Sequence, residues 1–474
     1  MFLIFDTETT GLPRNWNAPL IDADNWPRCI QIAWQLHDQD GNCVSYEDYL
    51  IRPDGFSIPY DAEKIHGIST ALAKKEGISL VEVLEKFQIA LDQCEFVGGH
   101  NVKFDLNIMG AEFLRLKDQN PLENYPIIDT CTEETATLCQ LPGGRGGKFK
   151  LPTLGELHVY LFDAEFQEAH NATADVEATT RCFFELFRLG RIQPEALKNR
   201  GEFLQQLKSV LEHPIKGIGL KHENLKSASA LLVELANKEE EPAKTMTIAE
   251  EEVFQKAPYV HLHTHSQYSV LQSTSRINDL VKAAVTDAMP ALALTDHANL
   301  MGVFHFVKAI KNHNAGLEEG QASLKPILGC EFFVCEDHQD RSRRDNGYQI
   351  VFLAKNKKGY DNLSKMSSIA YTEGFYYVPR IDKKIVEAFK SDLIVLTGNM
   401  YGEVPSKILN IGDHQAEEAL QWWHQQFGKD LYIELMRHQQ EDEKRANQVL
   451  LQLAKKYKIA LLATNNTYYT TKFI

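Results

Sequence analysis

Acidic side chains and histidines gather in three short stretches of the first half of the chain. These are Phe5–Gly11 (FDTETTG), His100–Asp105 (HNVKFD) and His170–Asp175 (HNATAD). Carboxylates can hold divalent cations, and a histidine can take a proton from water. Two cations and a general base are the parts needed for attack of water in line on a phosphodiester. We therefore expect metal-dependent phosphodiester hydrolysis.

The first stretch follows an apolar run, Met1 to Phe5, that predicts a buried strand. Asp6 and Glu8 lie two positions apart on its continuation, so the pleat directs both carboxylates to one face. Like charges side by side repel each other unless cations neutralise them, so the pair indicates a divalent metal site. An Asp-x-Glu pair alone is uninformative, because most chains of this length contain one by chance.

Asp105 and Asp175 complete a predicted cage of four carboxylates, and His170 lies about one helical turn before Asp175. Taken singly, either aspartate is more readily explained as a helix N-cap or part of a solvated helix face. The full set in order favours a catalytic site, because an apolar strand and a Thr-Thr-Gly turn accompany the first pair and a helix follows the last aspartate.

These motifs resemble the DnaQ-like exonucleases of the DEDDh branch, which includes the proofreading epsilon subunit of bacterial replicases. All five hallmark positions are filled, and Glu63–Ile68 is similar to the Ile-His-Gly-Ile stretch of that family. The resemblance covers residues 1–189 and implies a ribonuclease H-like α/β domain. The hallmark residues are Asp6, Glu8, Asp105, His170 and Asp175.

The resemblance also implies how the site works. The four carboxylates would hold two Mg²⁺ or Mn²⁺ ions, and His170 would deprotonate the attacking water. Leu12 and His66 would wedge against the terminal bases, and the backbone of Thr7 and Glu8 would meet the 3′ hydroxyl. Single-stranded DNA would be hydrolysed from its 3′ end to nucleoside 5′-monophosphates.

The length of 474 residues predicts two or three domains, and the composition is that of a globular protein. Eight cysteines without a Cys-x-x-Cys pair favour a reducing cytosol. No apolar stretch is long enough to span a bilayer and no basic leader precedes the first strand, so we expect a cytoplasmic protein.

The net charge of −15 does not exclude a nuclease, because cations would neutralise the carboxylate cage. The basic loop Arg145–Lys150 fits a nucleic-acid contact and a solvated turn equally well.

The organisation of the chain follows from its patterns. Phe183, Phe184 and Phe187 continue the helical periodicity behind Asp175 and predict an aromatic face packed on a sheet. Residues 190–257 change to charged helical segments broken by prolines, which predicts a helical connector and linker without chemistry of its own. Beyond it, strands and helices alternate again and predict a barrel-like architecture. The strand candidates are Tyr259–His265, Ala291–Thr295, Ile327–Val334, Gln349–Leu353, Leu393–Leu396, Leu431–Leu435 and Ala460–Ala463.

A second set of histidines lies in this half. The stretches His261–Ser269, Leu294–His297 and Gly329–Glu331 resemble the PHP domain, in the version near the start of bacterial DNA polymerase III alpha subunits. The segments Glu373–Asp382 and Leu462–Asn466 strengthen the resemblance. It implies a (β/α) barrel over residues 258–474.

The PHP resemblance implies a depleted metal site. His263, His265, His297 and Glu331 stand at ligand positions. Five of the nine positions carry neutral residues, so the charge that binds metal ions is largely lost. We expect at most one weakly bound metal, held by His263, His265 and Glu331, and a domain that is structural. The replacements are Gln272, Gln349, Asn399, Asn466 and Tyr468.

Together the resemblances imply proofreading by the first domain for a bacterial replicative polymerase. The polymerase core that follows PHP in the family is absent from residues 1–474, so the chain is a fragment of a longer subunit or the protein ends there. The implied partners are a DNA 3′ end, the polymerase core, the sliding clamp and other replisome subunits. Two alternatives remain open: a DEDDh exoribonuclease, which would use the same five residues, and a non-catalytic replisome scaffold.

Overall fold

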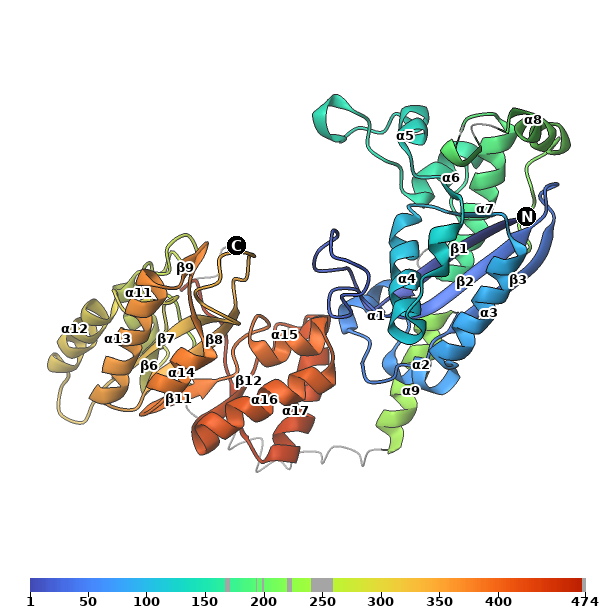
Figure 1. The fold of residues 1–474 in the computed structure, drawn as a ribbon. Coiled ribbons are helices and arrows are strands. Elements are labelled where there is room, and N and C mark those ends of the chain that lie inside the picture. The colour runs from blue at the N-terminus through green and yellow to red at the C-terminus, as the bar shows by residue number, and fades with distance from the viewer. Residues whose placement is uncertain (167–170, 193, 198–199, 220–223, 240–258, 471–474) are drawn as a thin grey trace. The chain divides into compact units, whose positions relative to one another are not determined.

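The structure is a computed structural model that describes residues 1–166, 171–192, 194–197, 200–219, 224–239 and 259–470. It divides into two compact units, Met1–Pro242 and Ala243–Ile474, and each is considered by itself (Figure 1). Among the described helices, none is long and apolar enough to cross a membrane. All eight cysteines are free thiols.

The first unit is built on a five-stranded sheet with the order β3-β2-β1-β4-β5. The central strand β1 pairs antiparallel with β2 and parallel with β4, and β4 pairs parallel with β5. The predicted first strand is confirmed, and it continues through both acidic positions. The strands are β1 (Phe2–Thr9), β2 (Cys29–His37), β3 (Cys43–Leu50), β4 (Phe96–Gly99) and β5 (Ile127–Asp129).

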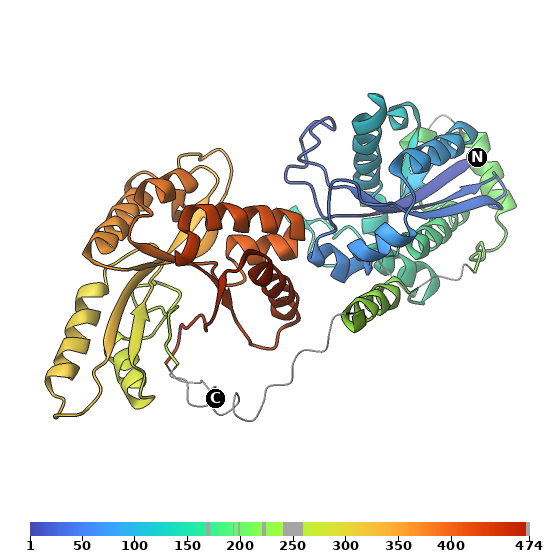
Figure 2. The same ribbon diagram turned by 90° about the horizontal axis from the view of Figure 1, so that it is seen from below.

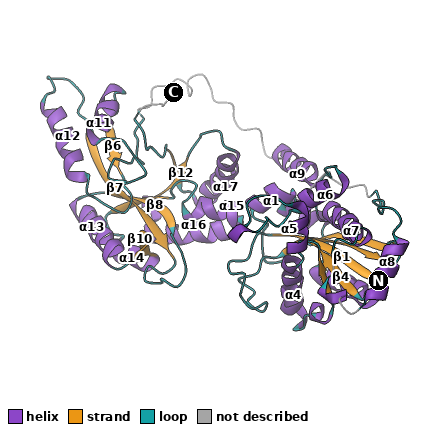
Figure 3. Ribbon diagram, turned by 90° about the horizontal axis from the view of Figure 1, so that it is seen from above, coloured by secondary structure: helices purple, strands orange, loops and turns teal. Residues whose placement is uncertain are grey.

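Helices cover both faces of this sheet (Figure 3). Leu3 and Phe5 of β1 pack with α3 and α4, whereas Phe2 packs with α6 and α7 on the other face. Phe183 and Phe184 of α7 make edge contacts with Phe2, so the predicted aromatic face is core. The helices are α1 (Tyr60–His66), α2 (Thr70–Glu76), α3 (Leu80–Gln93), α4 (Lys103–Lys117), α5 (Glu133–Cys139), α6 (Leu154–Phe162) and α7 (Ala172–Arg188).

Two helices of the predicted connector pack on this first unit. Leu207 and Leu211, in and just after α8 (Gly201–Val210), join the core beneath α7. Helix α9 (Leu225–Glu239) lies against α2, and the Ser229 hydroxyl donates a hydrogen bond to the Gly67 carbonyl at 2.7 Å. The connector residues 240–258 lie outside the described residues.

The second unit holds an eight-stranded mixed sheet with the order β13-β12-β11-β8-β7-β10-β9, and β6 also pairs with β7. Figure 2 shows the ribbon from a second side. Strand β8 runs antiparallel to β7 and β11. The strands are β6 (Ala291–Leu294), β7 (Lys325–Cys335), β8 (Tyr348–Ala354), β9 (Phe375–Tyr376), β10 (Val378–Asp382), β11 (Leu393–Leu396), β12 (Leu431–Leu435) and β13 (Ala460–Ala463).

Seven helices accompany these strands among the residues that the structure describes in this unit. A large core forms where α13, α16 and α17 pack on the sheet, and a smaller one joins α11, α12 and β6. The helices are α11 (Ile277–Thr286), α12 (Val303–Ala315), α13 (Lys357–Thr372), α14 (Lys383–Phe389), α15 (Glu403–Asn410), α16 (Asp413–Phe427) and α17 (Glu441–Tyr457).

The sequence prediction differs from this unit at two places. Residues Tyr259–His265 do not form a regular strand, because they make only isolated backbone hydrogen bonds to each neighbour instead of a continuous ladder. The Ala293 amide donates to the His261 carbonyl on one side, and Thr264 bridges to Thr467 on the other. This segment connects the two ends of the curved sheet. The short strands β9 and β10 were not predicted.

Candidate functional site

Three carboxylates meet at the C-terminal end of β1. Asp6 and Glu8 lie on β1 and Asp175 lies in the first turn of α7, and each contributes one oxygen to a group within 4.8 Å of one another. Asp6 and Glu8 continue the face of β1 that starts with Phe2 and Ile4. The alternation that packs α7 on the sheet therefore also brings these carboxylates to its N-terminal turn.

Asp105 approaches β1 from the first turn of α4, on the opposite face of the sheet. Its Oδ1 accepts hydrogen bonds from the backbone N–H of Thr7 at 3.0 Å and from the Thr7 hydroxyl at 2.6 Å. The residue between the two β1 acids thus fixes the position of the fourth carboxylate. All four predicted carboxylates come together, although Asp105 lies outside the tight group of three.

Crowding of these carboxylates changes their proton affinity. Burial, followed by the charges of Asp105, Asp175 and Glu8, raises the pKa of Asp6 well above its usual range. Burial and the neighbouring aspartates raise the pKa of Glu8 to about 8. Burial also raises the pKa of Asp105 to about 7, although the hydrogen bonds from Thr7 oppose the shift. Such a group of oxygen donors fits Mg²⁺ or Mn²⁺, because cations would supply the missing positive charge.

The start of α7 is anchored next to this group. The Asn171 side chain caps the helix by accepting a hydrogen bond from the Thr173 N–H at 3.1 Å. The Ala172 N–H donates to Gln31 Oε1 of β2 at 3.3 Å. These bonds fix the turn that carries Asp175. The predicted general base, His170, lies outside the described residues.

Sequence reasoning missed Asp129, the last residue of β5. Its Oδ1 accepts hydrogen bonds from the N–H groups of Asn101 and Cys131, each at 2.8 Å, and so holds the loop that leads into α4. Its charge contributes to the raised pKa of Asp105. A signal was available, because Asp129 ends a short apolar strand. His100 has a structural role, since burial lowers its pKa to about 4 and keeps the ring neutral.

The two residues expected to wedge against bases differ in exposure. Leu12 is 73 % exposed on the loop after β1. His66 is only 4 % exposed at the end of α1, where its Nδ1 accepts a hydrogen bond from the Ile68 N–H at 3.0 Å. Their contact with substrate stays a prediction.

The lysines of the basic loop are paired with acids. Lys148 forms an ion pair with Glu133, and Lys150 forms one with Glu156 at 2.7 Å. Because these pairs neutralise the lysine charges, the structure favours the interpretation of this loop as a surface turn.

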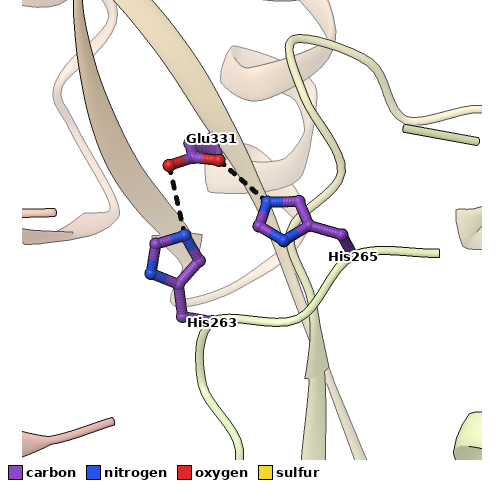
Figure 4. A group of neighbouring side chains, drawn as sticks. All are labelled: His263, His265 and Glu331. Atoms are coloured by element: carbon purple, nitrogen blue, oxygen red, sulfur yellow. Dashed lines mark hydrogen bonds and ion pairs between the residues drawn. The ribbon is translucent and has the colours of Figure 1, made fainter. Parts of the chain in front are cut away.

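In the second unit, three histidines converge on one glutamate. Glu331 of β7 is fully buried. Its Oε1 lies 3.2 Å from His263 Nε2, and its Oε2 lies 2.8 Å from His265 Nε2 (Figure 4). His297 Nδ1 lies 3.0 Å from the same Oε2. The structure therefore brings together the four residual ligand positions predicted from the sequence, and three of them form a group of metal-ligand geometry.

A second glutamate, missed by sequence reasoning, completes this centre. Glu434 of β12 is buried, and its Oε1 lies 2.8 Å from His263 Nδ1. Burial alone would lower the pKa of His263, but the two carboxylates raise it to about 10. Burial would likewise raise the pKa of Glu331, but His263 and His265 hold it well below its usual range. The two ring nitrogens of His263 thus bridge two carboxylates.

Most of the neutral replacements close around this centre. The Asn399 side chain donates to Gln349 Oε1 at 2.9 Å, so two amides bond to each other. Tyr468 stacks on His265 with ring centroids 4.3 Å apart, and its hydroxyl lies 3.1 Å from His297 Nε2. Asn466 Nδ2 lies 3.4 Å from the Tyr468 hydroxyl, whereas Gln272 is exposed.

Comparison with known proteins agrees with both resemblances. A family model described as an exonuclease matches residues 3–183, and one described as the PHP domain matches residues 261–438. The chain contains an exonuclease domain and a PHP domain. The predictions of an RNase H-like exonuclease followed by a PHP unit are confirmed at this level.

Curated relatives match the PHP region. The DNA polymerase III alpha subunit of Borreliella burgdorferi is 35 % identical over 221 residues, 46 % of this chain and 18 % of that protein. The alpha subunit of Treponema pallidum is 39 % identical over 216 residues, 44 % of this chain and 18 % of that protein. The chain therefore spans less than a fifth of the length of these relatives.

Among solved structures, exonuclease I from Methylocaldum szegediense is 22 % identical with a TM-score of 0.32, covering 43 % of this chain and 44 % of that chain. Exonuclease I from E. coli in complex with a dA16 oligonucleotide is also 22 % identical, with a TM-score of 0.31, covering 43 % and 42 %.

Proposed function

We propose that this protein removes nucleotides from the 3′ end of single-stranded or mismatched DNA and proofreads for a bacterial replicative polymerase. The observation that carries the proposal is the meeting of Asp6, Glu8 and Asp175 beside Asp105, with raised pKa values and therefore a need for cations. The resemblance of the motifs to proofreading exonucleases adds the polarity and the substrate.

In this proposal each side chain has one task. Asp6, Glu8, Asp105 and Asp175 hold two Mg²⁺ or Mn²⁺ ions, which when bound would stabilise the charge that develops on the phosphate and lower the pKa of the attacking water. Thr7 keeps Asp105 in position through its two hydrogen bonds.

The remaining roles concern the proton and the DNA strand. His170 accepts the proton of the attacking water. Leu12 and His66 contact the terminal bases, and the backbone of Thr7 and Glu8 contacts the 3′ hydroxyl.

The proposed context is a cytoplasmic replisome. The exonuclease occupies residues 1–189, the connector 190–257 and the PHP domain 258–474. The PHP half is structural, because its ligands already bond to one another, and it serves a polymerase core, the sliding clamp and other replisome subunits.

A gel assay tests this proposal. The purified chain is incubated with matched 3′-labelled and 5′-labelled single strands of DNA and RNA, in Mg²⁺ or in EDTA. We expect the 3′ label to be released as a mononucleotide first, a ladder of shortening products from the 5′-labelled DNA, and neither in EDTA. Faster degradation of RNA would replace the proposal by an exoribonuclease, and no degradation in Mg²⁺ or Mn²⁺ would leave the scaffold alternative.

A further inference from the structure

The inner face of the curved PHP sheet changes character from one end to the other. At one end it carries the histidine centre, with Glu331 on β7 and Glu434 on β12. On β7, Ile327 lies four residues before Glu331 and faces the same side of the sheet. On β12, Tyr432 lies two residues before Glu434 and also faces that side. Because alternate residues share a face, each strand passes from an apolar end to a polar end. The apolar residues form one cluster with Leu353 and Leu396.

A cavity of about 1040 Å³ opens at this apolar end. Its walls include Leu262, Ile327, Leu353, Ile394 and Leu462. In (β/α) barrels the interior is normally filled by layers of side chains. An apolar space of this size loses dispersion contacts, and it matches the volume and lining of sites that enclose small organic ligands. An apolar ligand would restore those contacts.

The charged residues that line the cavity are all positive. They are four lysines, and no aspartate or glutamate lines it, although the net charge of the chain is −15. Lys355 is paired with Asp430 at 2.9 Å and Lys357 is paired with Asp361. Lys311 of α12 and Lys325 of β7 have no ion pair to any residue within the described part of the chain, and both are exposed. The rim therefore offers two cationic groups to an anion.

We propose that this cavity binds a free fatty acid, with the alkyl chain against the aliphatic walls and the carboxylate at Lys311 and Lys325. The apolar walls exclude a highly charged ligand such as a nucleotide, because desolvation of several phosphates would not be compensated. The carboxylate of a fatty acid at the mouth of the cavity would stay hydrated on its solvent side and would contact the two lysines on its other side. The site lies at the opposite end of the strands from the histidine centre and does not depend on the proposed nuclease function.

The test uses the full chain and a fatty acid that carries a dansyl group, whose fluorescence rises in an apolar site. We expect saturable binding that unlabelled laurate displaces. Dodecanol lacks the charge and dodecyltrimethylammonium reverses it, so both should compete at least about tenfold less well than laurate, corresponding to the loss of a charge contact. Equal competition by all three, or no saturable binding, would overturn the proposal.

Two kinds of variant locate the site. Ile327→Trp fills the cavity and should abolish binding while raising or preserving the melting temperature. The double variant Lys311→Glu with Lys325→Glu should weaken laurate about tenfold and leave dodecanol unchanged. Lys308→Glu, the same charge reversal on α12 outside the cavity, is the matched control and should have no effect. Unchanged laurate affinity in the lysine double variant sinks the proposal even if Ile327→Trp fails to fold.

Discussion

The two units each gather ionisable groups at the end of a β-strand, half-buried in the first unit and buried in the second, but they balance charge in opposite ways. In the exonuclease domain, carboxylates lie beside carboxylates and the pKa of Glu8 rises to about 8. In the PHP domain, Glu331 lies among imidazoles and its pKa falls, while the pKa of His263 rises to about 10. The first centre needs positive charge from outside, and the second already contains it.

This difference in charge explains why the carboxylate cage of the exonuclease domain needs metal ions, whereas the histidine centre of the PHP domain is balanced without one. A carboxylate cage is a poor resting state without cations, because repulsion and burial both act against its charged form. A histidine that bridges two glutamates satisfies them without a metal ion. A cation in the PHP centre would have to break these hydrogen bonds.

Removal of one carboxylate from the exonuclease cage should have the largest effect. Asp6→Ala should lower exonuclease activity by about four orders of magnitude or more, because the cations lose a ligand that they need in the transition state. The metal-free chain should stay folded or become more stable, since repulsion is relieved. Asp175→Ala should behave alike, and Glu85→Ala on the exposed face of α3 is the control. Near-normal degradation of a mismatched primer by Asp6→Ala would refute the assignment.

Removal of the proposed base should have the next largest effect. His170→Ala should lower turnover by roughly two to four orders of magnitude and leave metal binding largely unchanged. In the parent chain, turnover should fall as pH drops through the histidine range, near pH 6.5. Single-turnover rates across pH measure this effect. A variant with the same rate at every pH would exclude His170 from the mechanism.

The PHP centre should respond in stability instead. His263→Ala leaves two buried glutamates without their shared cation, so it should destabilise the PHP unit by about 3–5 kcal/mol. Hydrogen exchange measured by mass spectrometry can follow each unit separately. The exposed His414 of α16 provides the control, as His414→Ala. No change in PHP protection would show that the bridge contributes nothing. Two results would show that the PHP domain is catalytic. One is two or more tightly bound metal ions in the PHP unit of the parent chain, and the other is a nuclease or phosphatase activity that His263→Ala abolishes.

The smallest expected effect is a pH dependence of stability that begins in different pH ranges in the two units. Unfolded carboxylates titrate near pH 4, but those of the metal-free cage titrate up to about pH 8, so the folded chain binds more protons between these values. Stability of the first unit in EDTA should therefore be greatest at low pH within this window and fall as pH rises through it.

The PHP centre should show no such fall between about pH 4 and pH 6.5. The raised pKa of His263 contributes stability that is complete below about pH 6.5 and is lost progressively as pH rises from there through about 10. Denaturant unfolding at several pH values, with and without Mg²⁺, measures both trends. Mg²⁺ should remove the pH dependence of the first unit, and Asp6→Ala should weaken it. A pH-independent first unit in EDTA would mean that the carboxylates do not repel one another.

Much of this arrangement is readable from short-range patterns. The alternation along β1 predicts that Asp6 and Glu8 share a face, and the helical period of Phe183, Phe184 and Phe187 predicts which side of α7 packs on the sheet. Most strands of the PHP unit follow in the same way, because an apolar run of a few residues between helical segments has few other structures available. The neutral residues at ligand positions follow from the resemblance to the PHP domain, which indicates where its ligands stand.

Residue types and local patterns therefore predict the set of acids and histidines, the order of the domains and most of the elements that carry them. Which of these groups neutralise one another depends on contacts that form only in the folded chain. Glu434 and the Asn399–Gln349 pair act through contacts between segments distant in sequence, and no local pattern marks them. The cavity at the apolar end of the PHP sheet is also invisible in the sequence. Its wall positions alternate like those of any core strand, and only the closure of the sheet shows that side chains leave the space between them unfilled.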